Sequence, residues 1–123
     1  MFDQRKFKRV AVHSRGRAES INGRHFGIIA RDITPEGLGL ITDYSLQIGD
    51  ILRVCINLED RKVCCKAKIV WVKQSYSCHH KPRYLCGAKI INVPQDYWPE
   101  LIGYYSRQIM RQFSQSFRPF YSS

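Results

Sequence analysis

The sequence predicts a mostly β fold, in which about six short antiparallel strands form a closed or nearly closed barrel and one helix follows. Two observations lead to this prediction. Strand-like stretches alternate between apolar and polar residues and are separated by turn residues at roughly even spacing. After Pro94 the apolar residues recur at helical spacing instead. The length of 123 residues suits one domain with a single hydrophobic core.

The first three strands are predicted at residues 10–19, 26–33 and 38–41. Asn22-Gly23 joins the first two, because both residue types tolerate the positive φ angles of a tight hairpin turn. Residues 34–37 join the second and third strands, with Pro at the second position and Gly at the fourth, as in a β-turn.

The second strand contains a break in its alternation. Ile28 and Ala30 share one face, whereas Ile33 falls on the opposite parity although an isoleucine there should also be buried. We therefore expect a β-bulge near Arg31-Asp32, where an extra residue reverses the alternation and turns the Asp32 side chain outward.

The last three strands are predicted at residues 51–58, 63–73 and 84–93. Gly87 and Lys89 of the final strand fall on its outer face. The side chains expected inside the barrel are Leu52, Val54, Ile56, Leu58, Val63, Cys65, Ala67, Ile69, Trp71, Tyr84, Cys86, Ala88 and Ile90.

The ends of the chain differ from the middle. We expect residues 1–9 to be a flexible arm that becomes ordered on an anion, residues 10–93 to form the barrel, residues 94–113 to form the helix and residues 114–123 to be a frayed tail. An apolar stripe on the helix should cover an open end or face of the barrel. Its members are Leu101, Ile102, Tyr105, Ile109 and Phe113.

The composition restricts the partners and the compartment. The net charge of +10 predicts attraction to nucleic acid, nucleotides, anionic lipid or an acidic protein, although a basic protein without any such partner has the same charge. No apolar run approaches the ~20 residues of a membrane span, and no apolar segment follows the first residues as in a signal peptide. Five cysteines without a secretory signal lead us to expect reduced thiols and a cytoplasmic protein.

Neither a metal site nor an active site is expected. Cys78-His79-His80 lies in a predicted loop, but the chain has no C-x-x-C pair and no H-x-x-x-H, so the spacing is poor for zinc. Unpaired thiols and a solvated polar loop explain these residues more simply. No Ser/His/Asp order, paired carboxylates or phosphate-binding glycine loop is present, and we do not expect an enzyme.

Two short motifs could bind a ligand if they meet in space. The first is Arg5-x-x-x-Arg9, and the second is Asp32-x-Thr34-x-x-Gly37. An arginine pairs bidentately with phosphate or with guanine O6 and N7, and a carboxylate accepts hydrogen bonds from guanine N–H groups. A flat, polar, anionic molecule such as a guanine nucleotide fits both motifs, whereas the arginines alone would be no more than a solvated basic tail.

The two motifs resemble those of the PilZ domain family over about residues 3–93. The resemblance rests on their order, on the six-strand pattern around them and on Cys86-Gly87-Ala88-Lys89-Ile90 in the last predicted strand. The resemblance implies a six-stranded Greek-key barrel that binds cyclic di-GMP and needs no other cofactor. It implies that Arg5 and Arg9 hold phosphate and stack on or pair with guanine. It also implies that Asp32 and Thr34 hydrogen-bond a guanine edge.

Two glycines match the family, and two positions differ from the residues that are usual in it. Gly37 would allow the turn and keep a side chain out of the site, and Gly87 would leave the strand bare beneath a base. Gln4 stands where many members carry another arginine, which leaves open whether the ligand binds as one molecule or as a stacked pair. Thr34 replaces the usual serine and keeps the hydroxyl while adding a methyl group.

The function that the resemblance implies is a free-standing bacterial cyclic di-GMP receptor. Its arm and surface would change on ligand binding and so regulate a protein partner in motility, pilus function or biofilm formation. One alternative is a PilZ-like adaptor that acts without ligand. Another is a nucleic-acid-binding barrel, supported by the net charge and by Lys62, Lys66 and Lys68 on one face. Because the strands show no row of exposed aromatics for base stacking, we do not expect nucleic acid as the partner.

Overall fold

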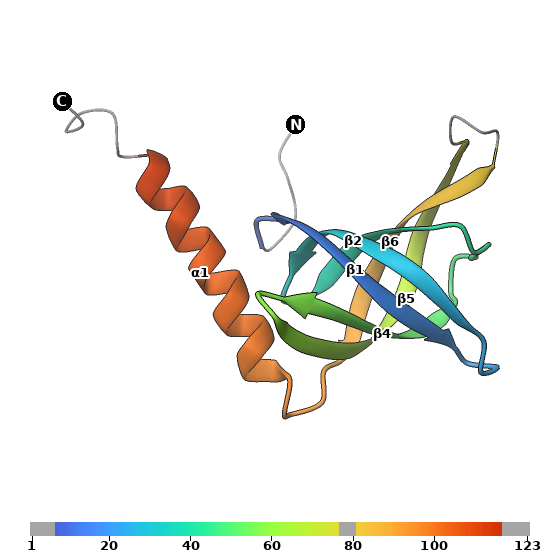
Figure 1. Cartoon of the computed structure of the whole chain (residues 1–123), viewed down its shortest axis with the longest axis horizontal. Coiled ribbons are helices and arrows are strands. Elements are labelled where there is room, and N and C mark those ends of the chain that lie inside the picture. The colour runs from blue at the N-terminus through green and yellow to red at the C-terminus, as the bar shows by residue number, and fades with distance from the viewer. Residues whose placement is uncertain (1–6, 77–80, 117–123) are drawn as a thin grey trace.

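The computed structural model describes residues 7–76 and 81–116, with side chains up to residue 113. Six antiparallel strands form a closed barrel in the order β1-β2-β3-β6-β5-β4, and one helix follows (Figure 1). The predicted fold class is confirmed. The elements are β1 (Val10–Ser20), β2 (His25–Thr34), β3 (Gly37–Thr42), β4 (Ile51–Leu58), β5 (Arg61–Tyr76), β6 (Pro82–Asn92) and α1 (Trp98–Ser116).

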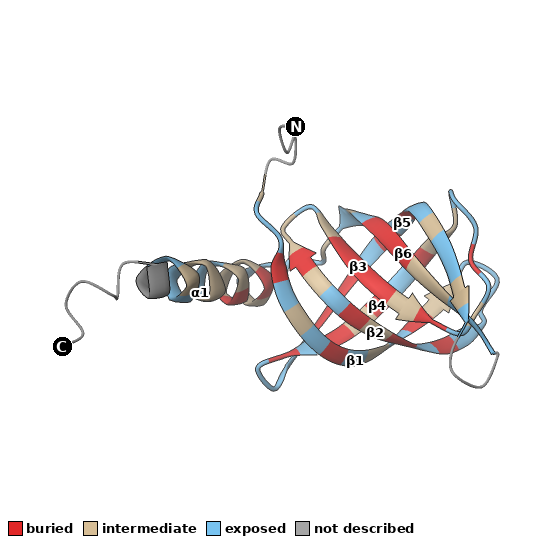
Figure 2. Ribbon diagram, turned by 90° about the horizontal axis from the view of Figure 1, so that it is seen from above, coloured by how far each residue is buried: buried red, intermediate tan, exposed pale blue. Residues whose placement is uncertain are grey.

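Alternating side chains fill the interior of the barrel. Figure 2 shows buried and exposed positions following one another along the strands, as expected when one face of each strand points into a closed core. On β4 the alternation is unbroken, so that the four side chains predicted to point inward are buried. The largest fully buried side chains are Ile33, Leu40, Leu52, Leu58, Ile69 and Leu101.

The predicted bulge on β2 is present. Ala30 pairs with Leu40 and Asp32 pairs with Gly39, which leaves Arg31 as the extra residue on β2. Ile33 is consequently buried, as its apolar side chain requires, and Asp32 stands on the outer side of the barrel. This bulge sets the direction of the Asp32 carboxylate.

A second bulge, on β5, was not predicted. Ile69 pairs with Ala88 and Trp71 pairs with Gly87, so Val70 is the extra residue. The prediction that Trp71 lies inside the barrel is therefore wrong: its side chain is 38% exposed. The extra residue reverses the alternation and places both Val70 and Trp71 outside.

Strands β5 and β6 are also longer than predicted. They extend to Tyr76 and from Pro82, and project beyond the barrel as a two-stranded ribbon (Figure 1).

Helix α1 packs on one end of the barrel through apolar residues between Leu101 and Ile109. Leu101 and Tyr104 are buried, and Tyr105 and Ile109 pack against the core at its edge. Phe113, which was expected in the same stripe, is 60% exposed. The helix extends away from the barrel beyond this packed region, as Figure 2 shows. Leu101 and Tyr104 therefore hold the helix on the barrel, salt bridges from Arg107 and Arg111 to Glu59 add to this attachment, and Phe113 remains on the surface.

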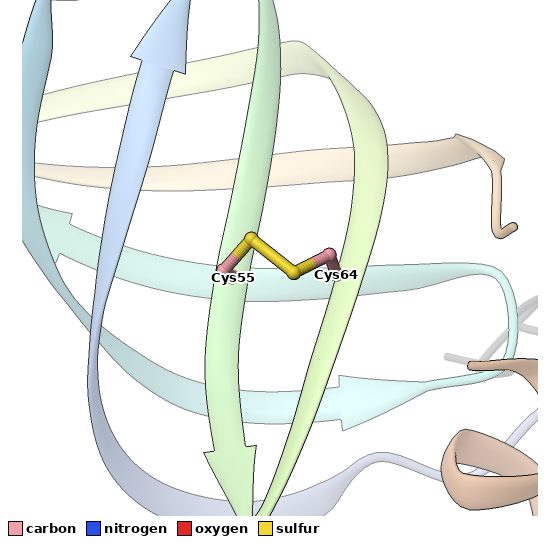
Figure 3. The surroundings of a disulfide bond; sticks show 2 residues. All are labelled: Cys55 and Cys64. Carbon is pink, nitrogen blue, oxygen red and sulfur yellow. A yellow bond between two sulfur atoms is a disulfide. The ribbon is translucent and has the colours of Figure 1, made fainter. Parts of the chain in front are cut away.

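Two cysteines are joined. Cys55 of β4 lies directly opposite Cys64 of β5, with Cα atoms 4.1 Å apart, and the two form a disulfide (Figure 3). The expectation of reduced thiols is wrong for this pair, because the hairpin register, which the sequence spacing did not reveal, brings them together. Cys65 and Cys86 are free and buried. Burial raises the pKa of Cys65 to about 12 and that of Cys86 to about 11.

Within residues 7–76 and 81–116, no helix has the length and apolar character needed to cross a membrane. The same residues contain no cluster of three or more His, Cys, Asp or Glu that could hold a metal ion. The Cys78-His79-His80 segment lies outside the described residues.

Candidate ligand-binding site

A pocket of about 180 Å³ lies where the end of the N-terminal arm meets the β2–β3 turn and the β5 bulge. Four separate stretches of the chain contribute to it, because strand β6 also lines the pocket, and the barrel closure brings them together. The lining residues are Phe7, Arg9, Asp32, Thr34, Glu36, Gly37, Leu38, Gly39, Val70, Trp71, Gly87, Ala88 and Lys89.

Arg9 and Asp32 face each other at this pocket. The Arg9 Nη1 and Asp32 Oδ2 atoms are 3.9 Å apart, and the two side chains are 42% and 25% exposed. Gly39, across the strand pair from Asp32, makes room for the carboxylate: a Cβ atom at Gly39 would lie 3.0 Å from both carboxylate oxygens. The pair is thus loose and reachable, which suits a cation and a carboxylate that bind a third group between them.

Thr34 shapes the turn beside them. Its hydroxyl oxygen accepts hydrogen bonds from the backbone N–H groups of Glu36 and Gly37, both at 3.0 Å. A Cβ atom at Gly37 would lie 2.8 Å from the carbonyl oxygen of Ala88, so glycine permits the close approach of β3 to β6. The Ile90 N–H donates to the Glu36 carbonyl at 2.8 Å and secures the turn to β6. The hydroxyl of Thr34 therefore organises the backbone, and a direct contact with a ligand stays a prediction.

Trp71 forms one wall of the pocket. Its indole ring covers the backbone of Gly87 on the neighbouring strand, and a Cβ atom at Gly87 would collide with the indole Nε1. Sequence reasoning missed this residue because strict alternation placed it inside. The run Ile69-Val70-Trp71-Val72 is apolar at four consecutive positions, however, and such a run in an otherwise alternating strand could have revealed the bulge.

The arm is attached to α1 next to the pocket. The Tyr105 hydroxyl donates a hydrogen bond to the Lys8 carbonyl oxygen at 2.6 Å. The rings of Phe7 and Tyr105 meet edge to face, with centroids 6.1 Å apart. Burial raises the pKa of Tyr105, so the hydroxyl keeps the proton that it donates. Because Phe7 also lines the pocket, a single residue of the arm contacts both the candidate site and the helix.

The structure places most of the predicted site residues together. Arg9, Asp32, Thr34, Gly37 and Gly87 all line this one pocket. The first arginine of the arm motif, Arg5, and the unusual Gln4 lie outside the described residues.

The chain matches the family model of the PilZ domain over residues 3–105. No curated protein matches it.

Among solved structures, the PilZ domain of YcgR from Escherichia coli with c-di-GMP gives a TM-score of 0.69 at 10% identity, over 94% of this chain and 99% of that one. The K. pneumonia MrkH–c-di-GMP complex gives 0.73 at 14% identity, over 93% and 56% of the two chains. The Bacillus subtilis inhibitor of motility, MotI/DgrA, gives 0.70 at 14% identity, over 90% and 54%. This chain spans about half the length of the last two proteins. At these sequence identities, the structural similarity shows the fold alone. The family model, in contrast, matches most of the chain, and the chain therefore belongs to the PilZ domain family.

Proposed function

We propose that the chain is a non-catalytic receptor for cyclic di-GMP and that the pocket at the β2–β3 turn is its binding site. The observation that carries this proposal is the meeting of Arg9 and Asp32 at a pocket walled by an exposed indole, that of Trp71. A cation, a carboxylate and an aromatic face match the three chemical features of a guanine nucleotide, namely phosphate, base edge and base face.

Each side chain has a distinct task in this proposal. The Arg9 guanidinium donates two hydrogen bonds to a phosphate or to the guanine O6 and N7 atoms, because it is planar and always charged. The Asp32 carboxylate accepts from the guanine N–H groups. Trp71 offers the flat surface on which a base stacks, and Gly87 keeps that surface close to the barrel.

The arm completes the site. The pocket of about 180 Å³ is smaller than the ~300–1,000 Å³ of most small-molecule sites, so the described residues enclose only part of a dinucleotide. We assign the remaining contacts to the arm, Arg5 included. The stoichiometry of binding will show whether the ligand binds as one molecule or as a stacked pair when Gln4 replaces the arginine.

The arm also gives the protein a way to report that ligand is bound. A ligand that orders the arm changes the surface formed by Phe7, Lys8 and Tyr105, and a protein partner that prefers the new surface is thereby coupled to the ligand. One protein of similar fold is named as an inhibitor of motility, which supports a motility partner, and a cytoplasmic location suits this role.

Calorimetric titration with cyclic di-GMP tests the proposal. We expect the wild type to bind at micromolar concentration or below, and Arg9→Ala and Asp32→Ala to lose at least tenfold in affinity, since each leaves its partner group without a counterpart. Arg31→Ala is the matched control, because Arg31 is exposed, adjoins Asp32 and does not line the pocket.

Two outcomes would contradict the receptor. One is a wild type that does not bind, which favours the ligand-independent adaptor. The other is an equal loss in all three variants, which indicates that only net charge attracts the ligand.

A further inference from the structure

The outer surface of three neighbouring strands carries a group of six cations. Strand β4 pairs with β1 on one side and with β5 on the other, and all six side chains of the group are exposed. We call this surface the basic face. Its members are Arg15 and Arg17 of β1, Arg53 of β4, and Lys62, Lys66 and Lys68 of β5.

The basic face carries far more positive than negative charge, with Glu19 as the acidic residue beside its six cations. Within residues 7–76 and 81–113, none of its six side chains forms a salt bridge. Glu19 lies directly opposite Arg53, but its carboxylate contacts His25 Nε2 at 3.0 Å. The positive charge of this surface is therefore available to a partner.

Like charges even lie directly opposite one another across the strands. Arg53 pairs with Lys66, and Lys68 pairs with Lys89 of β6. Such pairs destabilise a sheet, because the side chains of directly opposed residues are close neighbours. A polyanion that lies over the strands would relieve this repulsion.

The basic face is hollowed where β1 and β4 meet. A groove of about 540 Å³ lies there, and its charged or titratable lining residues are the cations Arg15, Arg17, Arg53 and Lys62 together with Glu19 and His25. It is separate from the candidate ligand-binding site, since the two share no lining residue. A concave groove with cations along it can follow a phosphate chain more closely than a flat surface can.

We infer that the basic face binds the phosphate backbone of double-stranded nucleic acid. From Lys62 to Lys68 the face measures about 20 Å along β5. A duplex of that length carries about a dozen phosphate charges on its two strands, enough to engage several of the cations at once. The contacts are to phosphate, so binding is independent of base sequence and strongly dependent on salt.

The composition of the face favours a duplex over other polyanions. Strands β1 and β4 and residues 61–68 of β5 contain no Phe, Tyr or Trp. A single strand needs aromatic side chains on which its bases stack. A protein interface usually needs aromatic anchors and is poor in lysine. A membrane-surface site needs apolar side chains that insert into the lipid. From the sequence, nucleic acid was not expected as the partner because exposed aromatic residues for base stacking are absent. Binding to the backbone of a duplex does not require base stacking.

Fluorescence anisotropy with a labelled mixed-sequence DNA duplex of about 20 base pairs tests the inference. We expect binding at low salt, with log K falling linearly against log salt concentration. The double variant Arg53→Glu/Lys66→Glu should lose at least tenfold more affinity than Lys73→Glu/Arg83→Glu. The second pair makes the same change in net charge with exposed residues of β5 and β6 outside the face. The salt slope of the first variant should fall by roughly 2, because two phosphate contacts are lost.

Four outcomes would overturn the inference. They are no duplex binding by the wild type at low salt, an equal loss in both double variants, equal affinity for the unpaired single strand, and tighter binding to phosphatidylserine vesicles than to the duplex. Circular dichroism checks that both variants fold. Calorimetry should show cyclic di-GMP binding unchanged in both, so that a failure of the receptor proposal and a failure of this inference are separate results.

Discussion

The indole ring of Trp71 rests on the backbone of Gly87, the residue opposite it on the adjacent strand. The contact exists because the bulge at Val70 turns Trp71 out of the barrel and because Gly87 has no side chain to hold the ring away. The result is an aromatic wall beside the carboxylate of Asp32 and the guanidinium of Arg9.

Replacing Gly87 with alanine should displace Trp71. The new Cβ atom would occupy the position of the indole, and the half-exposed ring can swing into solvent, so the free energy of unfolding should change by less than about 1 kcal/mol. The affinity for cyclic di-GMP, measured by calorimetry, should fall roughly 5- to 150-fold as a base loses its stacking surface. Gly27→Ala is the control, because a Cβ atom there meets nothing within 4 Å. Equal affinities for the two variants would show that Trp71 does not contact the ligand.

Trp71 should also report ligand binding directly. The chain has two tryptophans, and the second, Trp98, starts α1 away from the pocket. We expect cyclic di-GMP to quench the fluorescence of the wild type, because a stacked base contacts the Trp71 indole. In Trp71→Phe, which keeps a smaller ring and leaves Trp98 as the emitter, the quenching should disappear. Quenching that persists in this variant would assign the signal to Trp98 and to the helix.

Thr34→Val should loosen the β2–β3 turn. Valine has nearly the same shape but cannot accept the hydrogen bonds from the N–H groups of Glu36 and Gly37. We expect a loss of about 1 kcal/mol in the free energy of unfolding by urea, together with weaker ligand binding. Thr34→Ser keeps the hydroxyl and should retain both properties. If Thr34→Val were as stable as the wild type, solvent would have replaced the two hydrogen bonds.

Tyr105→Phe removes one hydrogen bond between the helix and the arm. The ring contact with Phe7 remains, but the Lys8 carbonyl loses its donor. The arm is then less pre-organised at the pocket, so the affinity for cyclic di-GMP should fall roughly 2- to 10-fold. Amide hydrogen exchange at Arg9 should become faster in the free protein. Unchanged affinity together with unchanged exchange would mean that α1 does not position the arm.

Stability should decrease in alkaline solution. Burial raises the pKa values of Cys65 and Cys86 from 9.0 to about 12 and about 11, so the folded state holds protons that the unfolded state releases. The free energy contributed by these protonated thiols is fully present below about pH 9 and is lost progressively as the pH rises through 11 to 12. Urea unfolding at a series of pH values measures this, with the Cys55–Cys64 disulfide kept intact. A Cys65→Ala variant should show a shallower decrease, and a wild-type stability that rises above pH 9 would contradict the assignment.

The sequence predicts the fold well wherever the strand period of two is undisturbed. Strand β4 is an example, because its four inward side chains are all aliphatic and alternate with less apolar residues from Arg53 onward. The bulge at Arg31 could be predicted too, since Ile33 had to be buried and only an extra residue allows it. At Val70 no such conflict arose: tryptophan is acceptable either inside or outside a barrel, so the alternation alone placed Trp71 on the wrong side.

The candidate site was predictable to the extent that it lies in local motifs. Arg9 and Asp32 were expected to meet, and they do. Trp71 and Tyr105 were not expected there, because each reaches the site through a contact with a residue distant in sequence, namely Gly87 and Lys8. The disulfide between Cys55 and Cys64 was missed for a related reason, since it depends on the hairpin register.

The strands along the chain, the inner face of most of them and the turn at residues 34–37 could be predicted from the sequence, because local stereochemistry and hydrophobic burial act over short stretches. The net positive charge follows from the composition. The pairings between strands that are not joined by a hairpin, β1 with β4 and β3 with β6, and the exact register of the hairpins depend on the complete fold. Closure of β1 on β4 gathers the cations into one face, and pairing of β5 with β6 places Trp71 on Gly87. Both are long-range contacts, set by the packing of the whole core, and local preference alone does not specify them.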